Sequence, residues 1–275
     1  MKRIVIIGAS VAGHSTATNL RQSDPDCSIT LVTEEPFVFY DRRRLPDFLR
    51  GAVKREEIFL SSEDFYSQNH IDFLKEKKVV SLNPKKMTVS FKEKEVLGFD
   101  FLVIASGRRI LLPDIPGAKK QGVVTLQALK DFQDLSARAF VDTVCVTGVD
   151  EASAAISSAI AERYKVEVVN GEPTEIIGEG EVQAVKLNTG KTIGVSMVIF
   201  TGGFKSNIDF LKDTPVNLAQ DFIMVDEFLR TNIENIFACG AVCGRLNWDD
   251  AVRDSTIIAD NITQKLKEQS CQPMS

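Results

Sequence analysis

The chain opens with alternating apolar and polar blocks that are typical of a parallel α/β protein. Residues 3–7 form a short apolar run rich in β-branched side chains, which predicts a buried strand that ends at Gly8. Residues 12–21 predict a helix, and residues 28–32 predict a second strand. Together these segments have the length of one βαβ unit, about 30 residues.

The following segment, up to a turn-rich stretch at 113–117, predicts a helix and several short strands. The helix is expected at 62–69, and the strands at 78–82, 86–91, 95–97 and 100–104. Pro113, Pro116 and Gly117 indicate a linker, because proline and glycine interrupt regular structure.

A second βαβ start follows the linker, in a segment that begins near residue 122. The pattern predicts a strand at 144–147, an alanine-rich helix at 151–164 and a strand at 166–169. A small meander of three strands is expected at 174–178, 181–187 and 191–200. The chain then predicts strands at 222–225 and 235–239 and a terminal helix at 248–268.

The composition is that of a globular protein of one or two domains. The 275 residues are 44% apolar and 26% charged, and the net charge of −5 gives no basic surface for nucleic acid. No apolar run reaches the roughly 18–20 residues of a membrane-spanning helix. The N-terminus has only four apolar residues before Gly8, too few for a signal peptide, so we expect a cytoplasmic protein without membrane contact.

The cysteines and histidines are too few and too scattered to indicate a catalytic or metal-binding site. The five cysteines are odd in number and are expected to be reduced thiols. Cys239 and Cys243 have a C-x3-C spacing, which differs from that of zinc knuckles and thioredoxin-type dithiols, and we interpret them as small buried residues. With only two histidines, we predict no catalytic side chain and no metal site.

The turn at Gly8–Gly13 is the motif that points to chemistry. It matches the dinucleotide fingerprint G-x-G-x-x-G, with Ser10 in place of the second glycine. Such a turn directs helix N–H groups at a pyrophosphate. Glu34, which lies 21 residues after Gly13, is the candidate for the adenosine ribose, with Glu35 as the second choice. The alternative is a tight turn that binds nothing.

Four motifs, the last of them in two parts, together resemble one family, the pyridine nucleotide-disulfide oxidoreductase superfamily of flavoproteins, near its NADH:rubredoxin reductase, nitrite reductase and NADH oxidase branch. In order along the chain they are Ile6–Gly13, Tyr40–Pro46, Phe101–Gly107, Val225–Thr231 and Ile236–Gly240. Their order and spacing extend over nearly the whole chain.

The resemblance implies a bound FAD and assigns residues to it. The expected cofactor-binding residues are Gly8, Ser10, Val11, Ala12 and Gly13 at the pyrophosphate, Glu34 or Glu35 at the ribose, Arg42, Val79, Ala105, Ser106, Gly107, Gly240, Ala241 and Trp248. It also implies an α/β fold, with a Rossmann-like three-layer FAD-binding domain at 1–115 and 206–275. A second, shortened nucleotide-binding-like domain is expected at 116–205.

Two departures from the family pattern change the expected activity. The family has Gly-Asp in its last motif, where the aspartate binds the ribityl chain of FAD, but this chain has Gly240-Ala241. The second fingerprint reads Gly148-Val-Asp150-Glu151, which places negative charge where a pyrophosphate would lie. We therefore expect NADH and NADPH to be poor reductants.

These features predict an electron-transfer flavoprotein with a redox partner protein, rubredoxin-like or ferredoxin-like, or a small acceptor. One alternative is an NAD(P)H-dependent flavin oxidoreductase with a non-standard nucleotide site. Another is a redox-silent relative that acts as a subunit or binding module. The sequence does not determine the oligomeric state, and a homo-oligomer is one possibility.

Overall fold

The computed structural model describes residues 1–138, 143–148 and 150–270, and it divides into two compact units. The first unit contains Met1–Tyr40, Ser61–Arg108 and Ser206–Ser275, and the second contains Asp41–Leu60 and Arg109–Lys205. The chain returns to the first unit at Ser206; the sequence-based domain boundaries, 115/116 and 205/206, stay a prediction. The second unit begins its longer segment at Arg109 and also contains residues 41–60, which the sequence analysis placed in the FAD-binding domain.

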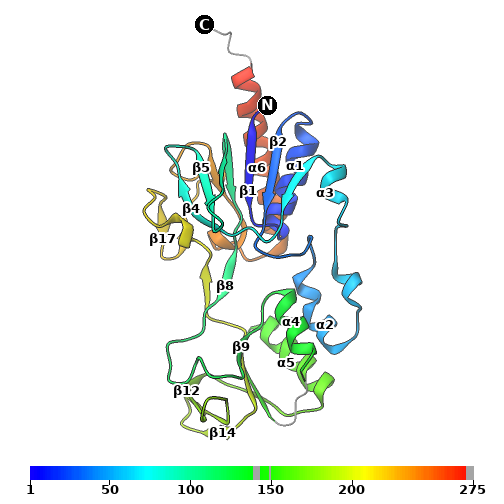
Figure 1. The fold of residues 1–275 in the computed structure, drawn as a ribbon, viewed down its shortest axis with the longest axis vertical. Helices are drawn as coiled ribbons and strands as arrows, with labels where there is room; N and C mark the ends of the chain where they lie inside the picture. Colours follow the sequence, from blue (N-terminus) through cyan, green and yellow to red (C-terminus); the bar gives the residue numbers. More distant parts are fainter. Residues whose placement is uncertain (139–142, 149, 271–275) are drawn as a thin grey trace. The chain divides into compact units, whose positions relative to one another are not determined.

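The first unit is built on a parallel sheet with the strand order β19-β7-β1-β2-β3 (Figure 1). The predicted strands are β1 (Arg3–Ile7), β2 (Ser28–Val32), β7 (Phe101–Ile104) and β19 (Ile236–Ala238). The edge strand β3 (Ile71–Leu74) was missed, because its run is only four residues long and contains an aspartate.

Side chains of alternate residues on β1 point to opposite faces of this sheet and define three layers. Val5 and Ile7 belong to a core cluster with residues of the antiparallel strands β4 (Val79–Asn83), β5 (Thr88–Phe91) and β6 (Val96–Gly98). Ile6 faces the other side, where α1 (Val11–Ser23) packs against α6 (Trp248–Ser270). The predicted three-layer Rossmann-like domain is confirmed.

The remaining helices and strands of the first unit are short, as are the two strands where the chain passes between the units. Helix α3 (Phe65–Gln68) is a single turn, shorter than the predicted 62–69. The others are β8 (Arg108–Ile110), β16 (Phe204–Ser206), η3 (Asp209–Leu211), β17 (Leu218–Ala219), β18 (Phe222–Ile223) and η4 (Gly240–Cys243).

The second unit has a parallel sheet with the order β11-β10-β15-β9 and an antiparallel meander. The parallel strands are β9 (Val123–Thr125), β10 (Val144–Thr147), β11 (Val168–Asn170) and β15 (Met197–Phe200). The meander consists of β12 (Pro173–Ile177), β13 (Ala184–Leu187) and β14 (Thr192–Gly194). The helical elements are η1 (Arg42–Arg44), α2 (Leu45–Arg50), η2 (Arg55–Ile58), α4 (Leu129–Ser136) and α5 (Glu151–Tyr164).

The prediction of one strand at 191–200 was wrong, because that segment divides between the two sheets. The Val195 amide donates to the Gln183 carbonyl beside the meander, whereas the Ser196 amide donates to Thr143 at the start of β10. Strand β15 therefore joins the parallel sheet, which has more strands than the expected βαβ unit provides. The unit is nevertheless short, since β11 continues into β12 across only two residues, with no helix between them.

Candidate dinucleotide-binding site

The two glycines of the first turn are required by the packing of the protein itself. Gly8 has a φ of +104°, and a Cβ there would lie 2.2 Å from the Ala105 carbonyl oxygen. A Cβ on Gly13 would lie 1.7 Å from the Gly8 carbonyl oxygen. The close contacts between the turn after β1, the turn after β7 and helix α1 therefore exclude any larger residue at either position.

Helix α1 begins at this turn with its first N–H groups uncapped. Ser10 is the N-cap residue, but its side chain makes no capping hydrogen bond, and the first turn contains no acidic residue. The amides of an uncapped first turn have no partner within the helix, and the helix dipole adds positive potential there. This arrangement favours binding of an anionic group at Val11 and Ala12.

Two further predicted segments lie against this turn. The Ser106 hydroxyl donates to the Asn207 carbonyl at 2.7 Å, and the Asn207 side chain donates to the Ser106 carbonyl at 2.8 Å. Gly107 has a φ of +67°, with open space around it. Gly240 has a φ of +73°, and a Cβ there would lie 2.9 Å from the Ala12 Cβ. The sheet thus brings the turns after β1, β7 and β19 together at the carboxyl ends of these strands.

The two candidate ribose carboxylates differ in their surroundings. Glu34 follows β2 and pairs with Lys78 at 3.3 Å, with both side chains more than half exposed. Glu35 accepts a hydrogen bond of 2.7 Å from the Tyr40 hydroxyl. Val79 packs in the same core cluster as Ile7 and Val32, near the ends of β1 and β2. The geometry therefore favours Glu34 as the carboxylate open to a ligand.

An aromatic stack lies in the first unit and includes Trp248, the first residue of α6. The Phe39 ring stacks on Trp248 at 5.7 Å and on His14 at 4.3 Å. His14 Nδ1 lies 2.9 Å from the Tyr66 hydroxyl, and burial lowers the pKa of His14 to about 4. The imidazole is therefore neutral near pH 7 and is a packed group of this stack.

The arginine block lies in the second unit and is largely occupied by hydrogen bonds. The Arg42 guanidinium donates to the Gln127 carbonyl at 3.2 Å. Arg43 makes two hydrogen bonds to the Asp41 carboxylate, at 2.8 and 2.7 Å, and Arg44 donates to a backbone carbonyl. Contact of Arg42 with a cofactor stays a prediction.

The turn after β10 is filled by its own side chains; its Val149 lies outside the described residues. Asp150 caps helix α5 by accepting from the Ser153 amide at 2.8 Å and from the Ser153 hydroxyl at 2.5 Å. The Thr201 hydroxyl donates to Ser153 Oγ at 2.8 Å. A Cβ on Gly148 would lie only 2.3 Å from Ser153 Oγ. Among the described residues of this turn, these contacts and the negative charge of Glu151 in the first helical turn disfavour an anion.

The cysteines beside the last turn are protonated thiols. Burial raises the pKa of Cys239 well above its usual range and that of Cys243 to about 12. The four cysteines within the described residues, Cys27, Cys145, Cys239 and Cys243, are free. Those residues also contain no cluster of histidine, cysteine, aspartate or glutamate suited to a metal ion.

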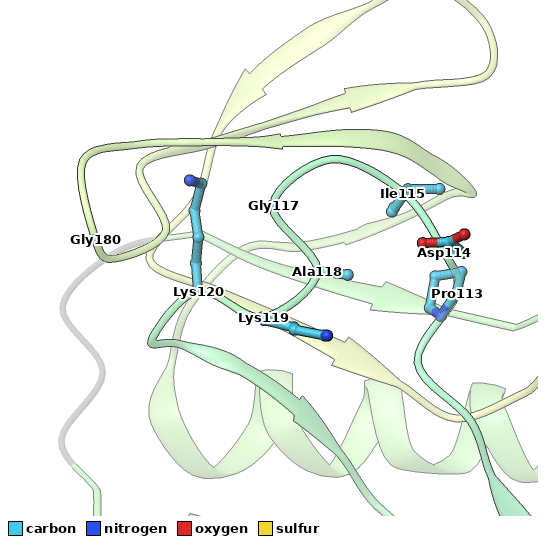
Figure 2. A pocket seen from close by; sticks show the side chains of 8 residues that line it. All are labelled: Pro113, Asp114, Ile115, Gly117, Ala118, Lys119, Lys120 and Gly180. Carbon is cyan, nitrogen blue, oxygen red and sulfur yellow. The ribbon is translucent and has the colours of Figure 1, made fainter.

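A separate pocket of about 380 Å³ lies in the second unit, around the turn at 113–120 and Gly180 (Figure 2). Its lining includes Asp114 as well as Lys119 and Lys120. Figure 2 shows these charged groups on an open turn rather than converging on one point. The pocket therefore gives no reason to move the candidate site away from the turn after β1.

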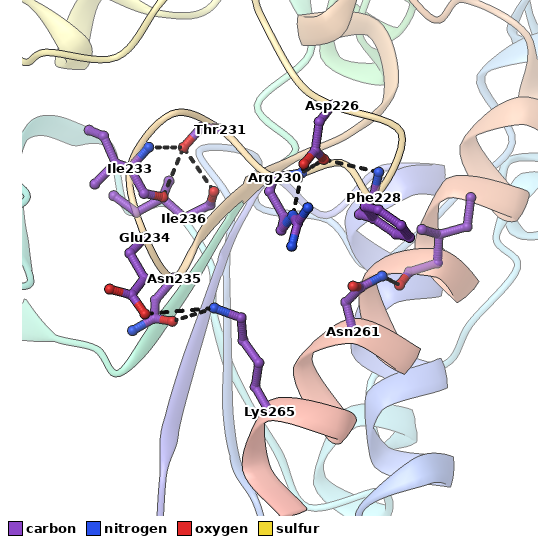
Figure 3. Close-up of polar contacts among 11 residues, drawn as sticks. Asp226, Phe228, Arg230, Thr231, Ile233, Glu234, Asn235, Ile236, Asn261 and Lys265 are labelled. Atoms are coloured by element: carbon purple, nitrogen blue, oxygen red, sulfur yellow. Dashed lines mark hydrogen bonds and ion pairs between the residues drawn. The ribbon is translucent and has the colours of Figure 1, made fainter. Parts of the chain in front are cut away.

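The segment at 225–235 is a loop, held by internal hydrogen bonds, that leads into strand β19 (Figure 3). The Asp226 carboxylate accepts from the backbone amides of Phe228 and Arg230, both at 2.9 Å, and from Arg230 Nε at 2.8 Å. Thr231 Oγ1 donates to the Ile236 carbonyl at 2.9 Å. These side chains bind backbone groups within the segment and hold it in the conformation that leads into β19.

Sequence reasoning missed a buried carboxylate near the last turn. Asp254 on α6 is fully buried, and its Oδ1 accepts from Arg245 Nη1 at 2.8 Å. The signal was present in the sequence, because Asp254 lies on the inner face of the helix with Ala251 and Ile258, three and four residues away.

None of the helices within the described ranges has the length and apolar character needed to cross a membrane. This finding concerns the helical elements alone.

Comparisons with known proteins point to one family. The model of the family described as pyridine nucleotide-disulphide oxidoreductase matches residues 2–149 and 139–255. An NADH oxidase of Methanocaldococcus jannaschii is 26% identical over 280 residues, covering 86% of this chain and 62% of that protein. An NADH-rubredoxin oxidoreductase of Clostridium acetobutylicum is 27% identical over 261 residues, covering 87% of this chain and 68% of that protein. The chain thus spans less than two thirds of the M. jannaschii protein.

The fold is similar to that of solved reductases. A covalent complex of putidaredoxin reductase with putidaredoxin superposes with a TM-score of 0.86 at 19% identity, covering 96% of this chain and 75% of that one. At this identity the likeness concerns the fold alone.

Proposed function

The chain belongs to the pyridine nucleotide-disulphide oxidoreductase family, and we propose that it is an FAD-dependent oxidoreductase that exchanges electrons with a small redox protein. The name of one relative reported above, an NADH-rubredoxin oxidoreductase, supports a rubredoxin-like partner, and we include a ferredoxin-like partner in the same proposal. The observation behind the proposal is that helix α1 is uncapped, whereas α5 is capped by Asp150.

The residues of the first unit fit FAD. The α1 amides at Val11 and Ala12 would donate to its pyrophosphate, and Glu34 would accept from the adenosine ribose. Gly107 has open space where a side chain would lie, so that a ligand can approach its backbone closely, whereas Gly240 lets the turn after β19 pack against Ala12. When bound, FAD supplies the electron exchange; the chain binds it, orients it and limits its contact with water.

The described residues at the start of α5 offer NADH and NADPH no comparable site. The Asp150 carboxylate and the Ser153 hydroxyl occupy the start of α5, and β11 leads directly into β12 without the helix and strand that would extend the crevice. We therefore propose that electrons enter through the partner protein. A cytoplasmic location belongs to the same proposal, supported by the free thiols.

The first test identifies the flavin. Purified protein is denatured, the released flavin is identified, and apoprotein is titrated separately with FAD and FMN. We expect FAD to be released and to bind more tightly than FMN, because only FAD can use the adenosine contacts. Recovery of FMN alone, or failure to bind FAD, would disprove the proposal.

The second test identifies the electron donor by anaerobic stopped-flow absorbance. We expect rapid reduction of the bound flavin by dithionite and by a reduced rubredoxin or ferredoxin, and little reduction by NADH or NADPH at millimolar concentration. The names of the relatives favour the alternative, an NAD(P)H-dependent oxidoreductase. Reduction by NADH at ~1–1000 per second would establish that alternative.

A further inference from the structure

The order of the strands divides the candidate site into two halves. In the sheet β19-β7-β1-β2-β3 the turn after β1 is central, and Glu34 follows the strand on one side of it. A dinucleotide on such a sheet places its pyrophosphate at the first turn and its adenosine ribose at the acidic residue after the second strand. The remainder of the ligand therefore extends in the other direction, over the turns after β7 and β19.

The adenosine half of the site presents polar groups that a ligand can reach. The amides of Val11 and Ala12 lie at the uncapped start of α1 and can donate to a pyrophosphate. The Glu34 carboxylate is more than half exposed and forms a surface ion pair with Lys78 at 3.3 Å. Surface ion pairs contribute about 1 kcal/mol or less, so a ribose can replace Lys78 at little cost.

The other half of the site uses its polar side chains within the protein. The Ser106 hydroxyl donates to the Asn207 carbonyl, and the Asn207 side-chain amide donates to the Ser106 carbonyl. The turns 105–107 and 239–244 contain no acidic residue, since Ala241 follows Gly240. Arg245, the next residue, binds the Asp254 carboxylate, which is fully buried and therefore closed to a ligand. A ligand over these turns meets no exposed carboxylate of theirs.

We infer that this site recognises the ADP part of its ligand and gains little affinity from the flavin part, so that FAD is an exchangeable ligand with which ADP competes. This inference rests on the proposed function. A polar ligand group that meets no hydrogen-bonding partner loses its contacts with water without replacement. The affinity for FAD should therefore be close to that for ADP, and the flavin content of the protein should respond to the concentration of adenine nucleotides.

Calorimetric titration of apoprotein with ADP, FAD and FMN measures the share of each part. We expect the dissociation constants of ADP and FAD to differ by less than about tenfold, and FMN, which lacks the adenosine, to bind at least about tenfold more weakly than ADP. A larger advantage of FAD over ADP would show that the flavin part carries the affinity and would overturn the inference.

Substitution of Glu34 tests the adenosine half. Glu34→Gln should weaken ADP and FAD binding by the same factor, about tenfold, because both ligands contain the ribose that loses a charged acceptor. The matched control is Glu35→Gln, which removes the neighbouring carboxylate, an acceptor for the Tyr40 hydroxyl, and should leave both affinities unchanged. A loss for only one of the two ligands upon Glu34→Gln would contradict the inference.

Ala241→Asp tests the other half by adding a carboxylate to it. This variant should bind FAD ~10–100-fold more tightly, because the new carboxylate can accept from a hydroxyl of the flavin part, and should bind ADP as the wild type does. Unchanged ADP affinity also shows that the variant is folded. Ala219→Asp, which adds a carboxylate at an exposed position of the same unit, should change neither affinity. Unchanged FAD affinity in Ala241→Asp would overturn the inference.

Displacement of bound FAD measures the exchange directly and separates this inference from the proposed function. Protein loaded with FAD is mixed with excess ADP, and the fluorescence of the released flavin is followed. We expect complete release, whereas flavin that stays bound overturns the inference and leaves the proposed function intact. Apoprotein that binds ADP but no FAD overturns the proposed function and the inference with it, and the first titration recognises this outcome.

Discussion

The turns after β1 and β10 have the same length and join a buried parallel strand to a helix, yet only the first is open to a ligand. Ser10 leaves the amides of α1 uncapped, whereas Asp150, at the corresponding position, caps α5. Gly13 corresponds to Ser153, whose hydroxyl binds both Asp150 and Thr201. The difference shows that side chains can occupy a phosphate site internally while the strand–turn–helix geometry is kept.

The largest expected change in stability comes from replacing Gly13, at the start of α1, with serine, the residue found at the corresponding position of α5. Gly13→Ser places a Cβ 1.7 Å from the Gly8 carbonyl oxygen, and we expect it to lower the free energy of unfolding by about 3 kcal/mol. Urea unfolding measures this change. Gly190→Ser is the control, since a Cβ there meets open space and only the φ of +83° is unfavourable, costing about 1 kcal/mol. An equal loss of unfolding free energy in the two variants would show that the Cβ at position 13 does not clash with the Gly8 carbonyl oxygen.

The pH dependence of stability should distinguish the two units, because both histidines belong to the first. The pKa of His14 falls from 6.5 to about 4 on folding, so the unfolded chain binds a proton that the folded chain does not. The free energy of unfolding of the first unit should therefore decrease by about 3 kcal/mol as the pH falls from 6.5 to 4.

Thermal unfolding at several pH values, with His14→Gln as the comparison, measures this slope. The variant should lose stability at pH 7 but show a smaller decrease below pH 6.5. The same slope in both proteins would mean that His14 is not the group that titrates.

Removing the two N-cap side chains should have unequal effects. Asp150→Ala breaks two hydrogen bonds to Ser153 and should cost about 1–2 kcal/mol, whereas Ser10→Ala breaks no capping bond and should cost less than about 0.5 kcal/mol. Urea unfolding of both variants makes the comparison. If Ser10→Ala costs as much as Asp150→Ala, the first turn is capped and is not an open anion site.

The smallest expected effect concerns the residues that follow the second strands of the two units. Glu34 pairs with the exposed Lys78, whereas Glu172, two residues after β11, accepts from Asn188 at 3.0 Å. Glu34→Gln should weaken FAD binding about tenfold, or 1.4 kcal/mol, by removing a charged acceptor for the ribose. FAD titration of the matched variant Glu35→Gln should give the wild-type affinity; the reverse ranking would assign the ribose to Glu35.

Long, regular apolar patterns allowed the main elements to be predicted from the sequence. Strands β1 and β2 and helix α5 agree with their predicted ends, since each is a continuous pattern bounded by turn residues. Strands β3 and β9 and helix α2 were missed because they are short and acquire stability from neighbours in the sheet or core. The assignment of 41–60 to the second unit depends on such long-range packing, which no local pattern specifies.

Candidate site residues were predictable where a turn motif identifies them, whereas buried polar residues on the helices were not. The turns containing Gly8, Ala105 and Gly240 meet as expected, because the carboxyl ends of neighbouring parallel strands share one edge. Asp254 was not predicted, since its proximity to Gly240 arises from the packing of α6 against α1. The role of Arg42 stays a prediction.

The division of the chain between the two units also determines the order in which they can be completed during synthesis. The second unit has all of its residues once Lys205 has left the ribosome, whereas the first still lacks β19 and α6. Until then the nascent first unit has an unpaired edge on β7 and an uncovered face on α1. Unpaired edges and exposed apolar faces promote association between chains, so the first unit is open to such association until residues 206–270 have been synthesised.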